Sequence, residues 1–501
     1  MSVERRFYIL LGLILCVAAF LRIYQLTIIP PGLYHDEAIN GNDALRNLET
    51  GTLQVFYPQN GGREGLYINL ITPLIALFGT EAWVLRLPAV IFGILTVWGV
   101  YLLAAELFGR RAGLLASFFL ATSFWHINFS RIGLRTIGSP LFLAWGLWLL
   151  LDAVRRVREG RPATGRMVLA GVVYGLGFHT YIAYRATPLL VTAVMLYGWR
   201  KTPALLRPLA AFAGAAGITV SPLLLYFAMH RDAFLGRASE VSILARPGAA
   251  GAFAENLWKL TQMIFTRGDF NWRHNIAFKP MVFWPVAILF AVGCGLSVYL
   301  LYRRKPEAFP YAIAIGWLAV AAVPAALTHD AMPHALRSLL MAPAVMILAG
   351  AAGSFLYDQL AGKLPARALV AATAVLATGL SYEAFHSYFD VWAKAPQVAE
   401  AFNRSAADIA ARINSLPDST PKYVVAVSPG APGALPSPAQ TIMFLTRSYT
   451  TRQQEARGIR YIPRTSPDQP DGVAYCQHVA ASLTSGELFC LQVNRSVAPS
   501  F

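Results

Sequence analysis

Two adjacent carboxylates, Asp36 and Glu37, follow the first long apolar segment and are the residues of this sequence best suited to chemistry. Polar residues then recur at helical spacing, at Asp36, Asn40, Asp43 and Asn47, which predicts a short surface helix with one polar stripe. A carboxylate whose pKa is raised by burial or by an adjacent acid can act as a general base. The alternative interpretation is that Asp36 caps this helix and that Glu37 favours its positive end.

Further ionisable side chains lie at the outer ends of predicted membrane spans, where such groups are costly and usually face a cavity or a partner. One arginine alone could simply anchor a helix end among lipid headgroups. Together they favour a site for the phosphate of a lipid-linked molecule, because guanidinium groups neutralise phosphate charge. The predicted donor-phosphate or acceptor-binding residues of these outer turns are Arg131, Arg135, His179, Tyr181, Arg185, His334 and Arg337.

A sugar attached to such a phosphate would define the reaction, because phosphate is a good leaving group. The enzyme must place an acceptor hydroxyl in line, remove its proton and stabilise charge on the departing phosphate. Asp36 would serve as the base. Histidine and aspartate side chains could hold a divalent ion beside the phosphate, but the sequence has no compact metal-ligand spacing. We therefore assign no metal ligand and no cofactor, and leave a divalent metal open.

The composition places these residues in a membrane protein. Of 501 residues, 56% are hydrophobic and only 14% are charged, which is typical of a polytopic membrane protein. The formal net charge of +16 comes from Lys and Arg beside the ends of apolar segments, as cytoplasmic flanks require. We therefore expect membrane lipids, not nucleic acid, as partners. The sequence has no Walker loop or dinucleotide fingerprint, which argues against an ATP-driven pump or a nicotinamide enzyme.

About eleven membrane spans are predicted, and they set the topology. Basic clusters lie in alternate links between spans, so we expect a plasma-membrane protein with a cytoplasmic N-terminus. The first outer loop 30–82, the long outer loop 229–280 and the tail would then lie outside. The apolar piece 66–78 is too short for a span and should be interfacial or re-entrant. The predicted spans are 7–29, 83–107, 112–129, 137–154, 167–183, 186–199, 208–228, 281–302, 309–327, 337–357 and 367–386.

The tail becomes polar and rich in proline near residue 390. Residues 422–427 read as a buried strand between two helical patterns. We therefore predict a transmembrane domain over 1–389 and a small extracytoplasmic α/β domain over 390–501. Cys476 and Cys490 both lie in the tail, and they could form a disulfide only if the tail lies outside the cytoplasm.

Several short blocks of residues are similar to those of one known family. The blocks are Pro30–Ala38, Gly62-Arg63-Glu64, Leu85-Arg86-Leu87-Pro88, Glu106–Arg111, His126–Gly133, Asp269–Asn275 and Pro333–Ser338. With them the chain resembles the polyprenyl-phosphate-dependent glycosyltransferases of the GT-C fold. More narrowly, it resembles the bacterial, family 39-like branch of the protein O-mannosyltransferase and aminoarabinose transferase group. The resemblance extends over roughly the first 350 residues.

The resemblance implies an all-α polytopic membrane protein with interfacial helices in the first outer loop, followed by the small α/β domain. It implies an inverting transferase that takes a sugar from a polyprenyl-phosphate donor, with Asp36 as catalytic base and Glu37 beside it. It also implies that Arg63 and Glu64 handle the donor phosphate or the acceptor. Aminoarabinose transferases have Glu-Lys-Pro there, whereas this chain has Arg63-Glu64-Gly65, so an aminoarabinose donor is not supported. The acceptor, whether glycan, lipid or protein, stays open.

Two other functions stay open from the sequence. A transporter or flippase would recognise a lipid phosphate or a small anion without chemistry, although transporters often have two related halves and we find no such symmetry here. A non-catalytic assembly or anchoring protein would depend on the tail and not on Asp36 and Glu37.

Overall fold

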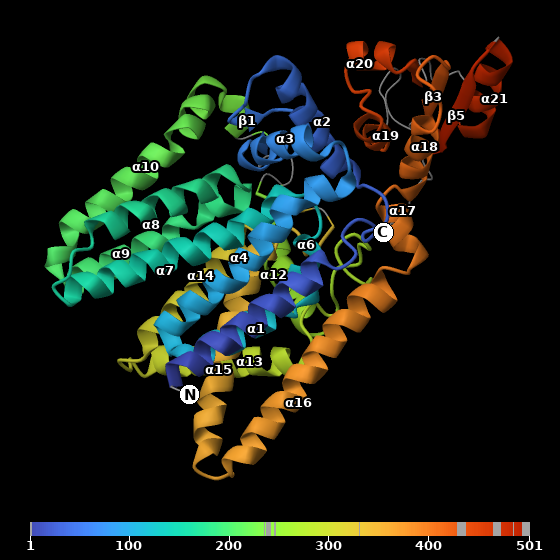
Figure 1. Cartoon of the computed structure of the whole chain (residues 1–501). Coiled ribbons are helices and arrows are strands. Elements are labelled where there is room, and N and C mark those ends of the chain that lie inside the picture. The colour runs from blue at the N-terminus through green and yellow to red at the C-terminus, as the bar shows by residue number, and fades with distance from the viewer. Residues whose placement is uncertain are drawn as a thin grey trace. The chain divides into compact units, whose positions relative to one another are not determined.

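The chain forms two compact units in the computed structural model, and these units interleave in sequence (Figure 1). The bundle unit comprises Met1–Tyr24, Gln54–Tyr67 and Pro88–Trp392, and the mixed unit comprises Gln25–Leu53, Ile68–Leu87 and Ala393–Phe501. The C-terminal tail therefore folds together with the part of the first loop that carries Asp36. The structure describes residues 3–234, 236, 242–244, 247–329, 331–427, 437–463, 472–483 and 485–492.

Apolar helices build the bundle unit. They are α1 (Val3–Ile23), α4 (Ala82–Phe108), α5 (Arg110–Ala121), α6 (Phe124–Phe129), α7 (Gly138–Arg158), α8 (Thr164–Leu176), α9 (Pro188–Lys201), α10 (Leu206–Met229), α12 (Ala249–Phe265), α13 (Trp284–Tyr302), α14 (Ala308–Ala326), α15 (Ala342–Ala361) and α16 (Ala366–Phe385). Short pieces join them: strands β1 (Phe56–Tyr57) and β2 (Arg63–Glu64) and the 3-10 turns Arg135–Ile137, Gly177–His179, Ile182–Ala186, Pro203–Leu205 and Leu339–Met341. A π-helical segment, His386–Trp392, follows α16. Helix α4 begins in the mixed unit and continues into the bundle unit.

Eight helices among the described residues are long and apolar enough to cross a membrane. The predicted number of about eleven spans is therefore not confirmed. The predicted spans 112–129, 167–183 and 186–199 fall on α5, α8 and α9, which have 12, 13 and 14 residues. At a rise of ~1.5 Å per residue, such helices extend over roughly 20 Å, less than the ~30 Å of a hydrocarbon core. The apolar piece 66–78 is helix α3 (Leu66–Phe78), and it also is shorter than a span.

The long helices differ in how much of their apolar surface is covered by protein. The spans that contain α7 and α15 are each 78% buried over their most apolar window, whereas those that contain α10 and α16 are 22% and 17% buried. Exposed apolar side chains on a helix of this length need lipid contact. The prediction of a polytopic membrane protein is thus confirmed, with α7 and α15 in the core of the bundle unit.

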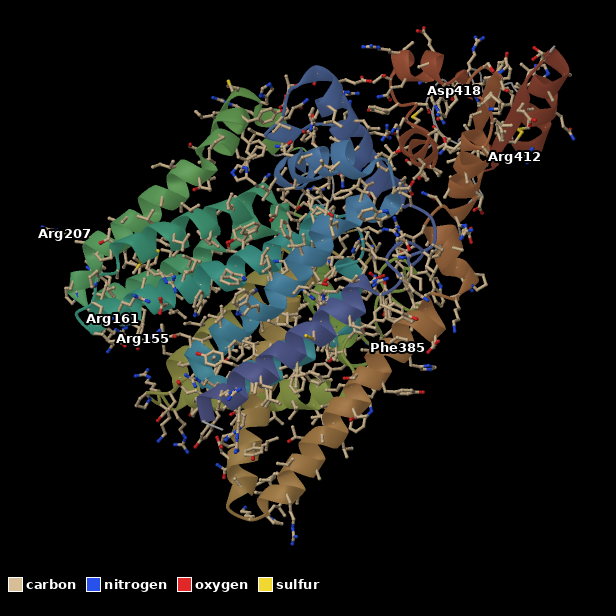
Figure 2. The ribbon with its side chains drawn as sticks, viewed as in Figure 1. Arg155, Arg161, Arg207, Phe385, Arg412 and Asp418 are labelled. Carbon is tan, nitrogen blue, oxygen red and sulfur yellow. A yellow bond between two sulfur atoms is a disulfide. The ribbon has the colours of Figure 1, made fainter. Side chains whose placement is uncertain are left out.

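Basic residues gather at one end of a helix group in the bundle unit. Figure 2 shows Arg155, Arg161 and Arg207 at the same end of α7, α8 and α10, and α8 packs against both neighbours. Asp152, which is 3% exposed, accepts hydrogen bonds from Arg155 at 2.5 Å and from Arg166 at 2.8 Å. The predicted basic link between α7 and α8 is therefore an ion-pair network at this end of the bundle unit.

The mixed unit contains the predicted small α/β fold. Strand β3 (Lys422–Val427) lies between β4 (Ile459–Pro463) and β5 (Glu487–Gln492), and both pairings are parallel. Its described helices are α2 (His35–Thr50), α3, α17 (Pro396–Ala401), α18 (Arg404–Asn414), α19 (Ala439–Leu445), α20 (Thr451–Ala456) and α21 (Gly472–Ser482). One core cluster joins α18 and α19 to the sheet, and a second joins α21 to it. A parallel sheet needs such cover because its strands are apolar on both faces.

Cys476 on α21 and Cys490 on β5 form a disulfide. The bond that the sequence allowed is therefore present, and it fixes the second helix layer to an edge strand of the sheet.

Candidate functional site

The acidic pair lies in the first turn of α2, in the mixed unit. The residue before the helix, Tyr34, is extended with φ −64° and ψ 140°, and its backbone N–H donates to Oε2 of Glu37 at 3.3 Å. This contact is half of a capping box. The predicted helix is present, but the cap is formed by Tyr34 and Glu37, and Asp36 is not the capping residue.

Glu37 is also held by a buried ion pair. Arg86 donates from Nε to Oε1 of Glu37 at 3.0 Å and from Nη2 to Oε2 at 3.3 Å, and both side chains are 0% exposed. Arg86 further donates to the carbonyl oxygens of Pro30 and Gly32 at 2.9 and 2.8 Å. One guanidinium group therefore fixes both the carboxylate of Glu37 and the turn that leads into α2. A carboxylate committed in this way is poorly placed to accept a substrate proton.

Asp36 has a different environment from Glu37. Its side chain is 34% exposed, and Oδ1 lies 3.8 Å from Nε2 of His35. Burial lowers the pKa of His35 below its ordinary value, although the charge of Asp36 opposes this. His35 is then a neutral neighbour at pH 7, and its Nδ1 has no hydrogen-bond partner among the described residues. Of the two acids, Asp36 is the one whose carboxylate can meet a substrate.

The polar stripe of α2 is present and buried. Asn40, Asp43 and Asn47 are only 2%, 2% and 3% exposed. Nδ2 of Asn47 donates to Oγ1 of Thr72 on α3 at 3.2 Å. The stripe is therefore buried and does not face water as a surface helix would. Single-sequence periodicity locates such a stripe but does not say which face is covered.

A second polar cluster, centred on Glu64 at the end of β2, lies in the bundle unit. Glu64 is 2% exposed, and its carboxylate forms ion pairs with two guanidinium groups. Nε of Arg135 lies 2.9 Å from Oε2, and Nη2 of Arg185 lies 3.3 Å from Oε1. Cζ of Arg135 lies 5.7 Å from the ring centroid of Tyr181. Burial lowers the pKa of Arg185, and the charge of Glu64 opposes this. Two cations on one carboxylate leave a net positive site, which suits an anion.

Three other predicted residues make contacts that hold the bundle unit together. Arg63 is 1% exposed and donates from Nε to the carbonyl oxygen of Gln59 at 3.3 Å. Arg131 is 0% exposed and donates to two carbonyl oxygens at the end of α1, at 3.2 and 2.7 Å. Nε2 of His179 is 2.9 Å from the carbonyl oxygen of Thr219. These contacts are all to backbone oxygens, and the substrate roles of Arg63, Arg131 and His179 stay predictions.

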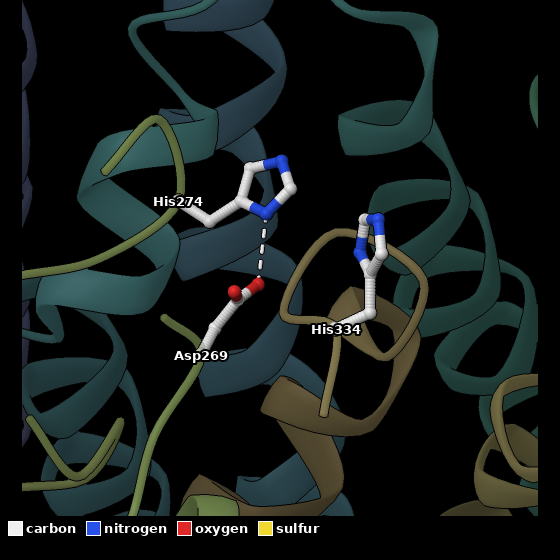
Figure 3. Close-up of side chains that lie close together, drawn as sticks. All are labelled: Asp269, His274 and His334. Atoms are coloured by element: carbon white, nitrogen blue, oxygen red, sulfur yellow. Dashed lines mark hydrogen bonds and ion pairs between the residues drawn. The ribbon is translucent and has the colours of Figure 1, made fainter. Parts of the chain in front are cut away.

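A third cluster contains His334 and joins two loops of the bundle unit (Figure 3). Nδ1 of His274 is 2.8 Å from Oδ2 of Asp269, and both residues are buried. The rings of His274 and His334 lie with centroids 4.7 Å apart. Possible metal-ligating atoms of these three residues lie within 4.8 Å of one another. His334 was among the predicted site residues, whereas Asp269 and His274 were not, although both stood in one of the quoted blocks.

The surroundings of this cluster fit an anion better than a metal ion. Asp269 already accepts the backbone N–H groups of Asn271 and Ala335, at 2.8 and 2.7 Å. Burial, and then the charges of His274, Arg337 and Arg273, hold the pKa of His334 well below its ordinary value. Burial also lowers the pKa of Arg273 to about 10. Two arginines beside one satisfied carboxylate oppose a divalent cation and favour a phosphate-like group.

The role of Arg86 was not predicted from the sequence, although Arg86 stands in one of the quoted blocks. It stands near the start of an apolar helix, where an arginine usually anchors a helix end at the headgroups. Its partner Glu37 is 49 residues away in the chain, so no local pattern connects them. The available signal was an arginine inside a membrane-length segment, which marks a functional or structural partner by default.

Comparisons with known proteins agree with the predicted resemblance. Residues 66–226 match the family model described as dolichyl-phosphate-mannose-protein mannosyltransferase, less than half of the chain. The chain is also similar to the "Putative mannosyltransferase YkcB" of Bacillus subtilis, with 26% identity over 199 residues. That match covers 37% of this chain and only 26% of the relative, so the chain spans about a quarter of the relative's length.

Two solved structures have a similar fold over most of the chain. ArnT from Cupriavidus metallidurans, bound to undecaprenyl phosphate, gives a TM-score of 0.58 with 15% identity and covers 92% of this chain and 90% of that one. The archaeal oligosaccharyltransferase AglB from Archaeoglobus fulgidus, in complex with an inhibitory peptide and a dolichol-phosphate, gives 0.53 with 15% identity and covers 93% and 65%. The predicted GT-C-like fold is confirmed.

Proposed function

We propose that this protein is an integral-membrane inverting glycosyltransferase. It moves a sugar from a polyprenyl-phosphate donor to a hydroxyl acceptor on the outer face of the membrane. The observation that carries the proposal is the division of labour in α2: Glu37 is buried and paired with Arg86, while Asp36 beside it is 34% exposed. The family match and the lipid phosphates in the two similar structures support a lipid-linked donor.

The proposed reaction is a single displacement. Asp36 accepts the proton of the acceptor hydroxyl, whose oxygen attacks the anomeric carbon of the sugar. The bond from that carbon to the phosphate oxygen breaks, and the electron pair leaves with the polyprenyl phosphate. One displacement inverts the configuration at the anomeric carbon. Departure is easier where cations stabilise the growing phosphate charge, and the net positive cluster of Glu64, Arg135 and Arg185 is suited to that role.

The third cluster is a second candidate for the phosphate. Arg273 and Arg337 provide positive charge there, and neutral histidines can donate hydrogen bonds to phosphate oxygens. Arg135 and Arg337 are therefore the two positions at which donor affinity should be measured. A divalent metal is not needed for this scheme.

The acceptor side is proposed to be extracytoplasmic. The disulfide between Cys476 and Cys490 supports this orientation, because disulfides persist in oxidising compartments. Basic residues collected at one end of α7, α8 and α10 agree with a cytoplasmic flank. We propose the plasma membrane as the location, with the N-terminus in the cytoplasm.

The function can be tested in cells that lack the protein. Cells without the transferase do not use its donor, so one polyprenyl-phosphate sugar should accumulate. Mass spectrometry of the extracted lipids would identify that donor. The purified protein should then release polyprenyl phosphate from that donor in the presence of acceptor. Transport without chemistry, the alternative function, would move the intact lipid and release no polyprenyl phosphate. Unchanged lipid pools together with no release would overturn the proposal.

A further inference from the structure

We infer that the C-terminal domain positions the helix that carries Asp36, so that transfer depends on contacts between α19 and α2. The inference rests on the proposed function, since it assigns positioning residues to that reaction. We call the three contacting residues of α19, Gln440, Thr441 and Phe444, the α19 seat. All of these contacts lie within the mixed unit.

The first contact holds the chain immediately before α2. Oγ1 of Thr441 donates to the carbonyl oxygen of Leu33 at 2.9 Å, and both atoms are buried. Nδ2 of Asn403 lies 3.4 Å from the same oxygen. Leu33 is three residues before Asp36. The seat therefore fixes the backbone from which the first turn of α2 starts.

The second contact lies further along the helix. Nδ2 of Asn42 donates to the backbone oxygen of Gln440 at 3.1 Å and to its side-chain oxygen Oε1 at 2.8 Å. Asn42 is 0% exposed. A buried amide that loses these partners would be left unsatisfied, which is costly. This bond therefore sets the rotation of α2 about its axis.

The third contact explains a glycine inside the helix. A Cβ atom at Gly41 would lie 2.5 Å from ring atoms of Phe444 and 3.1 Å from Cδ1 of Leu85. Phe444 is 0% exposed, so its ring has little freedom to move away. Glycine within a helix is destabilising relative to alanine. The close approach of the α19 seat therefore explains why glycine occupies position 41.

The far end of α2 is tied to the same domain. Nη2 of Arg46 donates to the hydroxyl of Tyr449 at 2.9 Å, and Glu49 accepts a hydrogen bond from Nε2 of Gln453 at 2.6 Å. With the seat near its start, α2 is thus held along its length by one domain. A general base must lie within hydrogen-bond reach of the proton it removes, and a misplacement of ~1 Å can lower the rate by about 100-fold. A shift of α2 therefore moves Asp36 out of position without touching it.

The test compares one substitution at two glycines. Gly41→Ala should lower kcat for sugar transfer by about 10- to 100-fold through displacement of the base, with the KM for the donor changed less than about twofold. Gly41→Ala/Phe444→Leu should regain most of that loss, since the smaller side chain makes room for the new methyl group. Gly214→Ala is the matched control, because a Cβ there meets no atom within 4 Å in α10. Its kcat should equal that of the wild type.

A second pair of variants avoids any added bulk. Thr441→Val keeps the shape of the side chain but removes the donor to Leu33, and it should lower kcat by about 3- to 10-fold. Thr441→Ser keeps the hydroxyl and should restore activity. A purely structural role for the hydroxyl would lower the yield of folded protein and leave the kcat of the folded fraction unchanged, which would contradict the inference.

Hydrogen exchange tests whether the α19 seat holds α2, without any assay of activity. Backbone amides of α2 should exchange faster in Gly41→Ala than in the wild type, and Gly41→Ala/Phe444→Leu should restore their protection. Wild-type exchange and wild-type kcat in Gly41→Ala would overturn the inference. If the wild-type protein transferred no sugar from any polyprenyl-phosphate donor, the proposed function would fail, whereas the exchange result would still decide whether α19 holds α2.

Discussion

At the scale of single residues, one buried ion pair separates the roles of two adjacent acids. Glu37 and Arg86 are both 0% exposed and are joined by two hydrogen bonds. Asp36 has the same charge and adjoins Glu37, but its carboxylate is partly exposed and lies 3.8 Å from His35. Environment, not residue type, therefore distinguishes the positioning acid from the proposed base.

Replacing Arg86 by Met should destabilise the mixed unit by about 3–5 kcal/mol, because Glu37 would remain buried without its cation. Glu37→Gln/Arg86→Met should be more stable than the single variant, since glutamine carries no charge and can still accept the Tyr34 N–H. Scanning fluorimetry of the purified proteins measures both changes. An Arg86→Met protein that unfolds at the wild-type temperature would show that the pair does not have this role.

The lowered pKa of His334 predicts a loss of stability in acid. Burial and neighbouring positive charges keep His334 neutral in the folded state, whereas the unfolded chain takes up a proton near its pKa of ~6.5. The stabilising contribution of neutral His334 is therefore fully present above the pKa of the unfolded chain. It is lost as the pH falls toward the lower pKa of the folded state, and the free energy of unfolding should decrease by about 1 kcal/mol at pH 5.5. Thermal unfolding at pH 7.5 and pH 5.5 tests this. His334→Gln should show the smaller difference, and an equal difference would refute the assignment.

At the scale of elements, the difference between the predicted spans and the observed helices has a local explanation. A hydropathy window over 112–129 runs through Thr122 and Ser123, where α5 ends and α6 begins. The window over 167–183 runs through Gly177–His179, where the α-helix tightens into a 3-10 turn. Composition averages over these breaks, so sequence reasoning counted spans where the chain forms shorter helices.

The disulfide between α21 and β5 predicts where the tail lies. In intact cells, an impermeant maleimide should label Cys476 and Cys490 only after an impermeant reductant has opened the bond. Cys16 and Cys294 are free and should first be replaced by Ser. Cys490→Ser should also destabilise the domain by about 3 kcal/mol, as expected for a loop of 14 residues. Labelling that requires cell lysis would place the tail in the cytoplasm.

At the scale of the whole molecule, the GT-C-like fold was predictable and the pairing of distant segments was not. Apolar segments and basic flanks predicted a polytopic membrane protein, and the resemblance of several short blocks implied the GT-C fold; the strand at 422–427 was predicted from its composition. The hydrogen bond from Thr441 to Leu33 joins positions 408 residues apart. Nothing in one sequence connects such positions, because long-range pairing leaves no local periodicity.

Of the candidate site, the residues of one cluster were predictable from the sequence, whereas the pairing of Glu37 with Arg86 was not. Glu64, Arg135, Tyr181 and Arg185 were all named from their places in outer turns or from the resemblance, and the structure joins them in one cluster. Arg86 stood in one of the quoted blocks but was given no role, because its partner Glu37 is distant in the sequence. The remaining predicted arginines are buried by contacts between helices. A hydropathy profile contains no information about these contacts.

The central claim is that the carboxylate of Asp36 is the base for sugar transfer. The most direct measurement is the rate of polyprenyl-phosphate release, in the presence of acceptor, by Asp36→Asn compared with the wild type. Asp408→Asn is the matched control, because that carboxylate is exposed in the same unit and forms an ion pair with the exposed Arg404. The account predicts a loss of about 100-fold or more for Asp36→Asn and wild-type release for Asp408→Asn. Undiminished release by Asp36→Asn would contradict it.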